Sequence, residues 1–291
     1  MPSTESLEMI TKLISYDTTS RYSNMELITY IQDYLTSLDI ESTLVPNDDG
    51  NKASLYATVG PKDKPGVMLS GHTDVVPVDG QDWDSDPFSV IEKDGKLFGR
   101  GTSDMKSFIA LVLVALPKFI ERGLNTPLHL AFSYDEEIGC VGVRPMIEMI
   151  NGLPVKPRMA IIGEPTSMQV ITGHKGKRSY NAHIRGFEAH SSLAPTGVNS
   201  IEYAARLITH LQSMARRLQN EGPYDELYDV AHTTVHTGTI QGGTALNIVP
   251  KDCHIQFEFR YIGSDDPNPI EAEIMREAKE VLEPEMKAIN P

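Results

Sequence analysis

The sequence predicts an α/β protein built from two domains, and three observations support this prediction. In the first part of the chain, short apolar runs alternate with stretches of helical periodicity, which is typical of a sheet covered by helices. From about Lys177 the pattern changes, and its clearest strand, at 252–261, alternates apolar and polar residues. The chain also has 291 residues, more than a typical single domain. We therefore expect one domain at 1–176 and another at 177–291.

Two N-terminal helices and four strands are expected in the first domain. Apolar residues recur at helical spacing in two segments, at Leu7, Ile10, Leu13 and Ile14 and then at Leu27, Ile28, Ile31, Leu35 and Leu38. Ser23 or Asn24 is a suitable N-cap for the second helix. The expected strands lie at 54–59, 67–70, 128–134 and 159–162. Because helices separate these buried strands, they predict an α/β layer.

The second domain shows the element order β-α-β-β-α. Strands are expected near 179–185, near 232–240 and at 252–261, and helices near 199–219 and from about Pro269. This order matches a ferredoxin-like β-α-β-β-α-β module without its last strand. Residues 173–176 are the expected hinge between the two domains.

The composition argues against nucleic acid and membrane as partners. With 40 acidic against 26 basic residues, the formal net charge of -14 repels a phosphate backbone, and no basic stripe is present. The longest apolar run, 108–116, is interrupted by Pro117 and is shorter than the roughly 20 residues of a membrane span, so we expect it to be a buried helix. The first residues lack the pattern of a secretory signal.

The cysteines give no sign of a zinc site or a disulfide framework. Cys140 and Cys253 are the only two, and they lie far apart in the sequence. We therefore expect a soluble protein in a reducing cytoplasm.

Candidate metal ligands follow three of the expected strands. His72 and Asp74, the run Asp135 to Glu137, and Glu164 each come directly after such a strand, and Asp104 follows a Gly-rich turn at 99–103. In α/β sheets, ligands bind at the carboxyl ends of the strands. Histidine and carboxylate together suit zinc, cobalt or manganese, and the absence of thiolate favours a catalytic site over a structural one.

The spacing of these residues indicates which could bind metal together with a neighbour that supports the ligand or acts as a base. His72 and Asp74 lie two apart on an extended segment, so one can bind metal while the other orients it. Glu136 and Glu137 are adjacent, so one can bind metal while the other faces the water that the metal activates and relays its proton to a leaving amine.

Each of these residues also has an ordinary interpretation. The His72 and Asp74 pair could be solvated, a Glu-Glu pair is usually surface charge, and Asp104 could be a helix N-cap. The co-occurrence of four acid-bearing loops at one edge of the sheet favours the metal site.

Four motifs resemble the signatures of the M20 metallopeptidase family, and the resemblance spans essentially the whole chain. These motifs are Gly71-His-Thr-Asp-Val-Val-Pro77, Gly99-Arg-Gly-Thr-Ser-Asp-Met-Lys106, Asp135-Glu-Glu-Ile-Gly139 and Gly163-Glu-Pro-Thr166. Within the family, the segments 133–140 and 173–176 are more similar to acetylornithine deacetylases than to succinyl-diaminopimelate desuccinylases. The resemblance implies a zinc-peptidase-like catalytic domain and a ferredoxin-like domain that serves as lid and dimerisation domain.

The resemblance also implies a site with two zinc or cobalt ions. It assigns His72 and Glu164 to one ion, Glu137 to the other and Asp104 to a bridge between them, with Asp74 behind His72 and Glu136 as the general base. It further implies a homodimer formed through the second domain.

Three residues of the second domain are implied to contact the substrate. In relatives, the histidine at the position of His190 reaches the partner subunit's active site and stabilises the tetrahedral oxyanion, although without the family His190 would be an ordinary loop residue. Asn247 lies in a segment, 242–247, that is similar to the family's substrate-facing turn. Arg260 lies on the polar face of its strand, where it could bind an α-carboxylate or be a solvated charge.

One feature of the family pattern has no counterpart in the sequence. In the family, the second metal ion also binds a histidine near the C-terminus, whereas the last histidine here is His254 and the chain ends at Pro291. We therefore expect the last strand of the second domain and the returning part of the catalytic domain to be absent, and the second metal site to be incomplete.

The function expected from these features is metal-dependent hydrolysis of the amide bond of an N-acyl-L-amino acid. N-acetyl-L-ornithine is the first candidate substrate, giving L-ornithine and acetate in arginine biosynthesis. A desuccinylase, an aminoacylase or a dipeptidase of the same family is the alternative enzyme. A catalytically inactive remnant that only dimerises or binds a ligand through its second domain is the alternative outside the enzymes.

Overall fold

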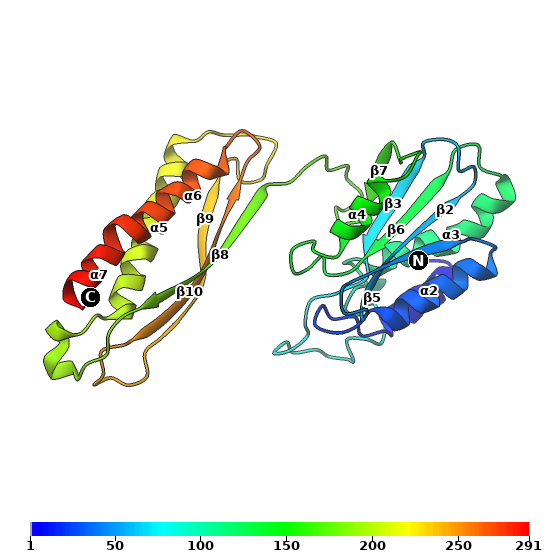
Figure 1. The fold of residues 1–291 in the computed structure, drawn as a ribbon. Helices are drawn as coiled ribbons and strands as arrows, with labels where there is room; N and C mark the ends of the chain where they lie inside the picture. The colour runs from blue at the N-terminus through cyan, green and yellow to red at the C-terminus, as the bar shows by residue number, and fades with distance from the viewer. Residues whose placement is uncertain (1, 291) are drawn as a thin grey trace. The chain divides into compact units, whose positions relative to one another are not determined.

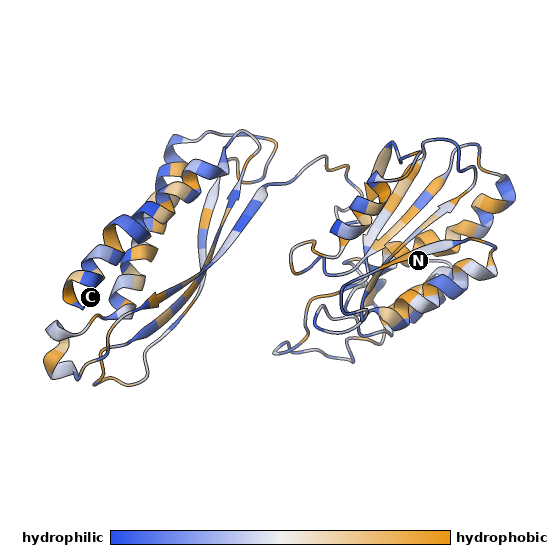
Figure 2. Ribbon diagram, in the orientation of Figure 1, coloured by the Kyte–Doolittle hydropathy of each residue, from blue (hydrophilic) through white to orange (hydrophobic). Residues whose placement is uncertain are grey.

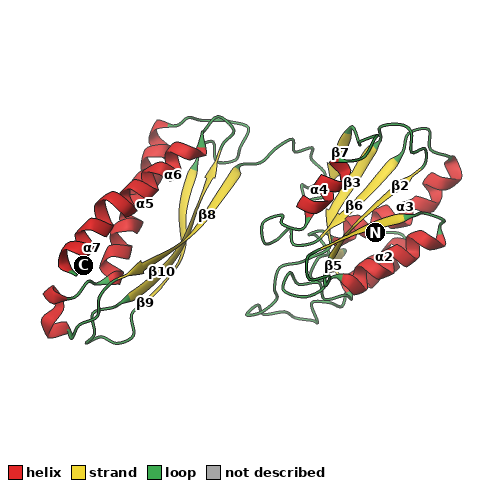
Figure 3. Ribbon diagram, viewed as in Figure 1, coloured by secondary structure: helices red, strands yellow, loops and turns green. Residues whose placement is uncertain are grey.

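The computed structural model describes residues 2–290, which fold into two compact units (Figure 1). Unit 1 extends to Gln169, and unit 2 begins at Val170. The predicted α/β class is confirmed, since both units combine helices and strands (Figure 3). The boundary expected between residues 176 and 177 falls at the first residue of strand β8 (Gly176–Arg185).

Unit 1 is built around a five-stranded sheet with the strand order β1-β2-β6-β3-β7. The strands are β1 (Ser42–Pro46), β2 (Ala53–Val59), β3 (Val67–His72), β6 (Leu128–Ser133) and β7 (Met159–Ile162). Strand β3 runs parallel to both β6 and β7, whereas β2 is antiparallel to its two neighbours. The carboxyl ends of β3, β6 and β7 therefore lie at the same edge of the sheet. A separate hairpin consists of β4 (Ile91–Lys93) and β5 (Lys96–Phe98).

Helices provide the core of unit 1 on both faces of this sheet. They are α1 (Thr4–Ile14), α2 (Met25–Ser37), α3 (Lys106–Arg122) and α4 (Val143–Asn151). Residues of α1, α2 and α3 pack with Leu55, Leu130 and Phe132, whereas Met146 of α4 packs with Tyr56 and Ala131. Neighbouring residues of β2 and β6 thus point to opposite faces, as the period of a strand requires. Figure 2 shows apolar residues, in orange, along these helices and strands.

The structure confirms the predicted helices α1 and α2 and the four predicted strands of unit 1, and it adds elements that the sequence did not reveal. Strand β1 is short, partly exposed and contains Pro46, so it carries little of the periodicity on which a prediction depends. Helix α4 was missed for a different reason, since its apolar residues, Met146 and Ile150 among them, do recur at helical spacing. Among the described residues, no helix is long and apolar enough to cross a membrane.

Unit 2 is a three-stranded antiparallel sheet, ordered β8-β10-β9, with helices packed on it. After β8 come a 3-10 helix η1 (Ser191–Thr196), α5 (Ser200–Glu221), β9 (Thr234–Gly242), β10 (Asp252–Tyr261), α6 (Pro267–Arg276), the π-helical turn η2 (Glu277–Leu282) and α7 (Glu283–Ile289). The predicted order β-α-β-β-α is confirmed. The spatial order, with the third strand in the middle, is consistent with a ferredoxin-like module.

The sequence of unit 2 accounts for its two layers. Strand β10 alternates between buried apolar residues, such as Phe257 and Phe259, and polar residues on its other face (Figure 2). The buried face packs against α5 and α6. Asn199 is the N-cap of helix α5, and its side chain accepts hydrogen bonds from the N–H groups of Ile201 and Glu202.

A buried histidine in the sheet of unit 1 makes the stability of this unit dependent on pH. His129, in β6, is 4% exposed, and its Nδ1 lies 2.7 Å from the hydroxyl of Tyr56 and 3.1 Å from that of Thr58. Burial lowers the pKa of His129. In the unfolded chain the histidine has its ordinary pKa of about 6.5 and therefore binds a proton more readily than in the folded chain. The free energy of unfolding consequently decreases as the pH falls below about 6.5.

We expect the thermal unfolding temperature of wild type to fall further between pH 7.5 and pH 5.5 than that of a His129→Asn variant. Each kcal/mol of difference in the free energy of unfolding shifts the unfolding temperature by roughly 2–4 °C. Differential scanning calorimetry at the two pH values measures the difference, and His236→Asn, at an exposed position of unit 2, is the control. An identical pH dependence in wild type and His129→Asn would contradict the expectation.

Candidate metal site

The parallel strands of unit 1 bring the expected ligands to one edge of the sheet. His72 is the last residue of β3, the Glu136 and Glu137 pair follows β6, and Glu164 follows β7. The backbone N–H and the hydroxyl of Thr73 both donate to the carbonyl of Ser133, each at 2.8 Å, and thereby fix the ends of β3 and β6 together.

A glycine permits the close approach of the third segment. The N–H of Gly163 donates to the carbonyl of Ser70 at 3.0 Å, which continues the pairing of β7 with β3. A Cβ atom on Gly163 would come within 2.0 Å of the ring of Phe108, in α3. Only glycine therefore fits directly before Glu164.

Asp104 does not cap helix α3. The N-cap position is held by Met105, and no side chain makes a capping hydrogen bond there. The carboxylate of Asp104 is instead directed at His72, with Oδ1 2.9 Å from Nε2. The ordinary interpretation of Asp104 as an N-cap is therefore wrong.

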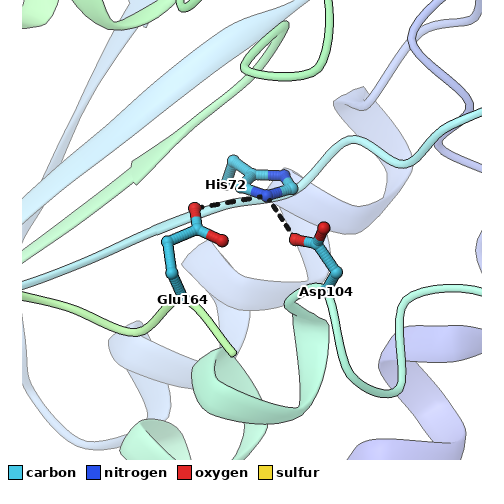
Figure 4. A group of neighbouring side chains, drawn as sticks. All are labelled: His72, Asp104 and Glu164. Carbon is cyan, nitrogen blue, oxygen red and sulfur yellow. Dashed lines mark hydrogen bonds and ion pairs between the residues drawn. The ribbon is translucent and has the colours of Figure 1, made fainter. Parts of the chain in front are cut away.

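His72, Asp104 and Glu164 form a compact group of possible ligands (Figure 4). The Nε2 atom of His72 lies 3.7 Å from Oε1 of Glu164, and one ligand atom from each residue lies within 4.8 Å of the other two. It is the only such group among residues 2–290. One imidazole nitrogen and two carboxylate oxygens are donors that suit zinc or cobalt, so these residues fit a divalent cation.

Asp74 supports the group from behind. Nδ1 of His72 lies 2.9 Å from the carbonyl of Asp74 and 3.4 Å from its Oδ1. With Nδ1 donating its hydrogen to Asp74, Nε2 faces the two carboxylates, and its lone pair would be free to bind a cation placed among them. The carboxylate of Asp74 also accepts from the hydroxyl of Ser20 at 2.8 Å and from the N–H groups of Glu136 and Glu137 at 3.1 and 3.2 Å.

The charges in this site favour a bound cation. Burial lowers the pKa of His72, but its contacts with Asp104 and Asp74 raise that pKa to about 11. Burial and the charge of Asp104 raise the pKa of Glu137 to about 7, and burial also raises the pKa of Glu164. These shifts arise because several carboxylates share a partly buried space, and a divalent cation would relieve their repulsion.

Glu136 lies beside the group without belonging to it. Its Oε2 is 4.0 Å from Nε2 of His72, and its Oε1 accepts from the thiol of Cys140 at 3.3 Å. Glu137 also lies outside the three-residue group. The roles predicted for the two glutamates, one as metal ligand and the other as base, stay predictions.

Several residues that shape the site escaped the sequence analysis. Ser20 holds Asp74, Lys52 makes an ion pair with Asp135, and the buried ammonium of Lys106 donates to the carbonyl of Tyr16 at 2.8 Å. Lys106 and Asp135 belong to the motifs quoted above, which was a signal for both. Ser20 and Lys52 are single residues in unremarkable segments, so the sequence offered no signal for them.

In unit 2, His190 and Asn247 lie close together. The N–H of Ser191 donates to the carbonyl of Asn247 at 3.0 Å, and His190 forms an isolated bridge with Ile248. The ring of His190 accepts from the N–H of Ser192 and so caps η1. Both His190 and Asn247 are exposed.

Arg260 lies at the other end of β10. Asn247 precedes the start of this strand, whereas Arg260 is its ninth residue, which places it roughly 27 Å along the strand from Asp252. Its guanidinium pairs with Glu258 at 2.9 Å and is 53% exposed. Within one copy of unit 2, the structure therefore does not bring Arg260 together with His190 and Asn247.

Comparison with solved structures supports the fold. A metallo-carboxypeptidase of the M20 family from Sulfolobus solfataricus superposes with a TM-score of 0.78 over 96% of this chain and 76% of that one, at 21% sequence identity.

Comparison with curated sequences finds acetylornithine deacetylases. The protein from Pasteurella multocida is 35% identical over 261 residues, and that from Shigella sonnei is 37% identical over 244 residues. The matches cover 87% and 83% of this chain and 67% and 62% of the relatives, so the chain spans about two thirds of their length.

The model of Peptidase family M20/M25/M40 matches residues 68–286, which include all four metal-site segments and most of unit 2. Together with the relatives, this match assigns the chain to a family of hydrolytic enzymes. The chain belongs to the peptidase family M20/M25/M40.

Proposed function

We propose that the chain catalyses the metal-dependent hydrolysis of the amide bond of an N-acyl-L-amino acid, with N-acetyl-L-ornithine as substrate. The observation that carries this proposal is the group formed by His72, Asp104 and Glu164, with the carboxylate of Glu136 beside it at 4.0 Å from His72. The two curated relatives, both acetylornithine deacetylases, support this choice of substrate. The products would be L-ornithine and acetate, and the proposed setting is arginine biosynthesis in the cytoplasm.

In this proposal the metal supplies Lewis-acid chemistry, polarising the acyl carbonyl and acidifying the attacking water. His72, Asp104 and Glu164 would hold one zinc or cobalt ion, whereas a second ion would have only Asp104 and Glu137 as ligands from this chain. Asp74 fixes the ring of His72 so that Nε2 keeps its lone pair for the metal.

Glu136 is the proposed general base. Its carboxylate takes a proton from the attacking water and delivers it to the nitrogen of the leaving amine, which balances the proton transfers of an amide hydrolysis. The thiol of Cys140 donates to Oε1 at 3.3 Å, which leaves Oε2 as the oxygen nearer the ligand group.

Unit 2 is the proposed lid and dimerisation domain. His190 is exposed, and from a partner copy its imidazole would donate to the oxyanion that develops on the acyl group. Asn247 lies beside it and is the proposed substrate contact on the same side. Arg260 remains a second proposed contact, for the α-carboxylate, that a different copy of unit 2 would have to supply.

We expect Asp74→Asn to weaken the binding of zinc about 10- to 100-fold, because the negative charge at Oδ1, 3.4 Å from Nδ1 of His72, is lost and the turn at Glu136 loses its anionic acceptor. The ring of His72 keeps its contact with the backbone carbonyl of residue 74. Isothermal titration calorimetry with a competing chelator measures the affinity. Asp79→Asn, which removes an exposed aspartate paired with Arg21 a few residues away, is the control and should bind zinc as wild type does. Equal affinities in the two variants would contradict the role of Asp74.

We expect Glu136→Gln to lower kcat for N-acetyl-L-ornithine about 100- to 10,000-fold while leaving zinc binding intact, because the amide cannot accept the proton. Release of acetate with added zinc or cobalt measures the rate, and Glu121→Gln, on the exposed side of α3, is the control.

The same assay with other substrates separates the alternatives. Faster turnover of N-succinyl-diaminopimelate, of another N-acyl amino acid or of a dipeptide would replace the proposed substrate within the family. Zinc binding without turnover of any of them would indicate a catalytically inactive binding or dimerisation module.

A further inference from the structure

A buried ion pair lies under the turn that carries Glu136 and Glu137. Lys52, directly before β2, places its ammonium 2.6 Å from Oδ1 of Asp135, and the two side chains are only 12% and 11% exposed. Asp135 is the residue directly before Glu136. No step of the proposed reaction uses either residue of this pair.

The environment of Lys52 shows that its ammonium connects two segments. Besides Asp135 it contacts the carbonyl of Ser20, also at 2.6 Å. Burying an ammonium is unfavourable unless it is paired and hydrogen-bonded. Here the carboxylate of Asp135 provides the ion pair and the carbonyl of Ser20 provides the hydrogen bond. Buried ion pairs are seldom more stabilising than apolar residues of similar volume, so stability alone does not explain the pair.

Both of these segments donate to Asp74. The hydroxyl of Ser20 donates to Oδ2 of Asp74 at 2.8 Å, and the N–H groups of Glu136 and Glu137 donate to its two carboxylate oxygens. Lys52 therefore joins the two pieces of chain that meet at Asp74.

The backbone of Asp135 sets the direction of the turn. Its φ of 54° lies in the left-handed region, which few residues other than glycine adopt. The carbonyl of Asp135 accepts from the N–H of Val141 at 3.1 Å, which closes the loop behind the two glutamates. With this conformation, two successive N–H groups face Asp74 and the side chain of Glu136 is delivered beside His72.

We propose that Lys52 and Asp135 are positioning residues for Glu136 and Glu137: their ion pair holds the turn in the conformation that anchors it on Asp74. The proposal rests on the function proposed above for what Glu136 does, but the placement of the turn can be tested without catalysis. Loss of the pair is expected to free the turn while the sheet beneath it stays folded.

The test compares Lys52→Met, Asp135→Asn and the double variant with wild type in the full chain. Methionine keeps an unbranched stem but removes the ammonium, and asparagine tolerates the left-handed conformation but removes the charge. Tyr56→Phe is the matched control, because it removes a buried hydrogen bond between the same two strands, β2 and β6, without touching the turn.

The first measurement is hydrogen exchange of single backbone amides by NMR, which reports local opening. In Lys52→Met, the amides of Glu136 and Glu137 should exchange at least about tenfold faster than in wild type, while the amide of Thr73, bonded to Ser133, should not change. In Tyr56→Phe the amides of the two glutamates should keep their wild-type rates.

The second measurement is kcat for N-acetyl-L-ornithine at a temperature where all variants are folded. We expect a loss of about tenfold or more in Lys52→Met with little change in KM, and the double variant should lose no more than the worse single variant, because both act through one contact. A kcat within twofold of wild type, or additive losses, would overturn the proposal.

The two measurements keep the two proposals separate. If wild type has no activity, the proposed function fails for this chain, and the exchange rates alone decide the positioning role. Unchanged exchange of Glu136 and Glu137 in Lys52→Met refutes that role whatever the activity. Equally fast exchange in Tyr56→Phe also refutes it, since the effect would then be general loosening of the strands.

Discussion

The carboxylate of Asp74 is the contact on which the geometry of the metal site depends. It accepts hydrogen bonds from the hydroxyl of Ser20 and from the N–H groups of Glu136 and Glu137. Nδ1 of His72 lies 2.9 Å from the backbone carbonyl of Asp74 and 3.4 Å from its Oδ1. These partners come from the loop before α2, the end of β3 and the turn after β6. Asp74 thus orients both the ring of the proposed metal ligand His72 and the turn that carries the proposed general base Glu136. The sheet brings these segments close, and Asp74 fixes their relative orientation.

The constraint that follows is electrostatic. Asp74, Asp104, Glu136, Glu137 and Glu164 surround a single imidazole. Burial lowers the pKa of His72, but contacts with Asp104 and Asp74 outweigh it and raise this pKa to about 11, and burial with the charge of Asp104 raises the pKa of Glu137 to about 7, so both groups hold protons more tightly than usual. A divalent cation would replace these protons, so its affinity is linked to pH and its binding stabilises the folded chain. The residues that create the crowding are therefore unfavourable for folding alone and favourable once a cation is bound, which is expected of a functional site rather than of a structural one.

The sequence was sufficient for the parts of the molecule that depend on local pattern. The sequences of β2, β3, β6 and β7 are mainly apolar, which identified all four as strands although β7 is exposed. His72, Asp104 and Glu164 could be placed together because parallel strands end at one edge of a sheet. Contacts that depend on the register between distant segments could not be predicted. The contact between Lys52 and Asp135, which lie 83 residues apart, follows from the pairing of β2 with β6. It could not be predicted from either residue alone. The same holds for Arg260. The alternation of β10 predicted that Arg260 lies on the polar face, but its distance from Asn247 became clear only from the structure.

The choice of an aspartate at position 135 illustrates how local strain and fixed geometry are combined. Glycine would adopt a φ of 54° with no steric cost, yet it would leave the turn with greater freedom and no side chain for Lys52. Aspartate is among the few other residues that tolerate this conformation, and its carboxylate converts the turn into one end of an ion pair whose other end also contacts Ser20. The backbone conformation and the ion pair therefore reinforce each other: the left-handed residue aims two N–H groups at Asp74, and the ammonium of Lys52 holds that residue in place. We therefore expect Glu136, the proposed general base, to keep its distance to the proposed metal ligands even though its own side chain is partly exposed.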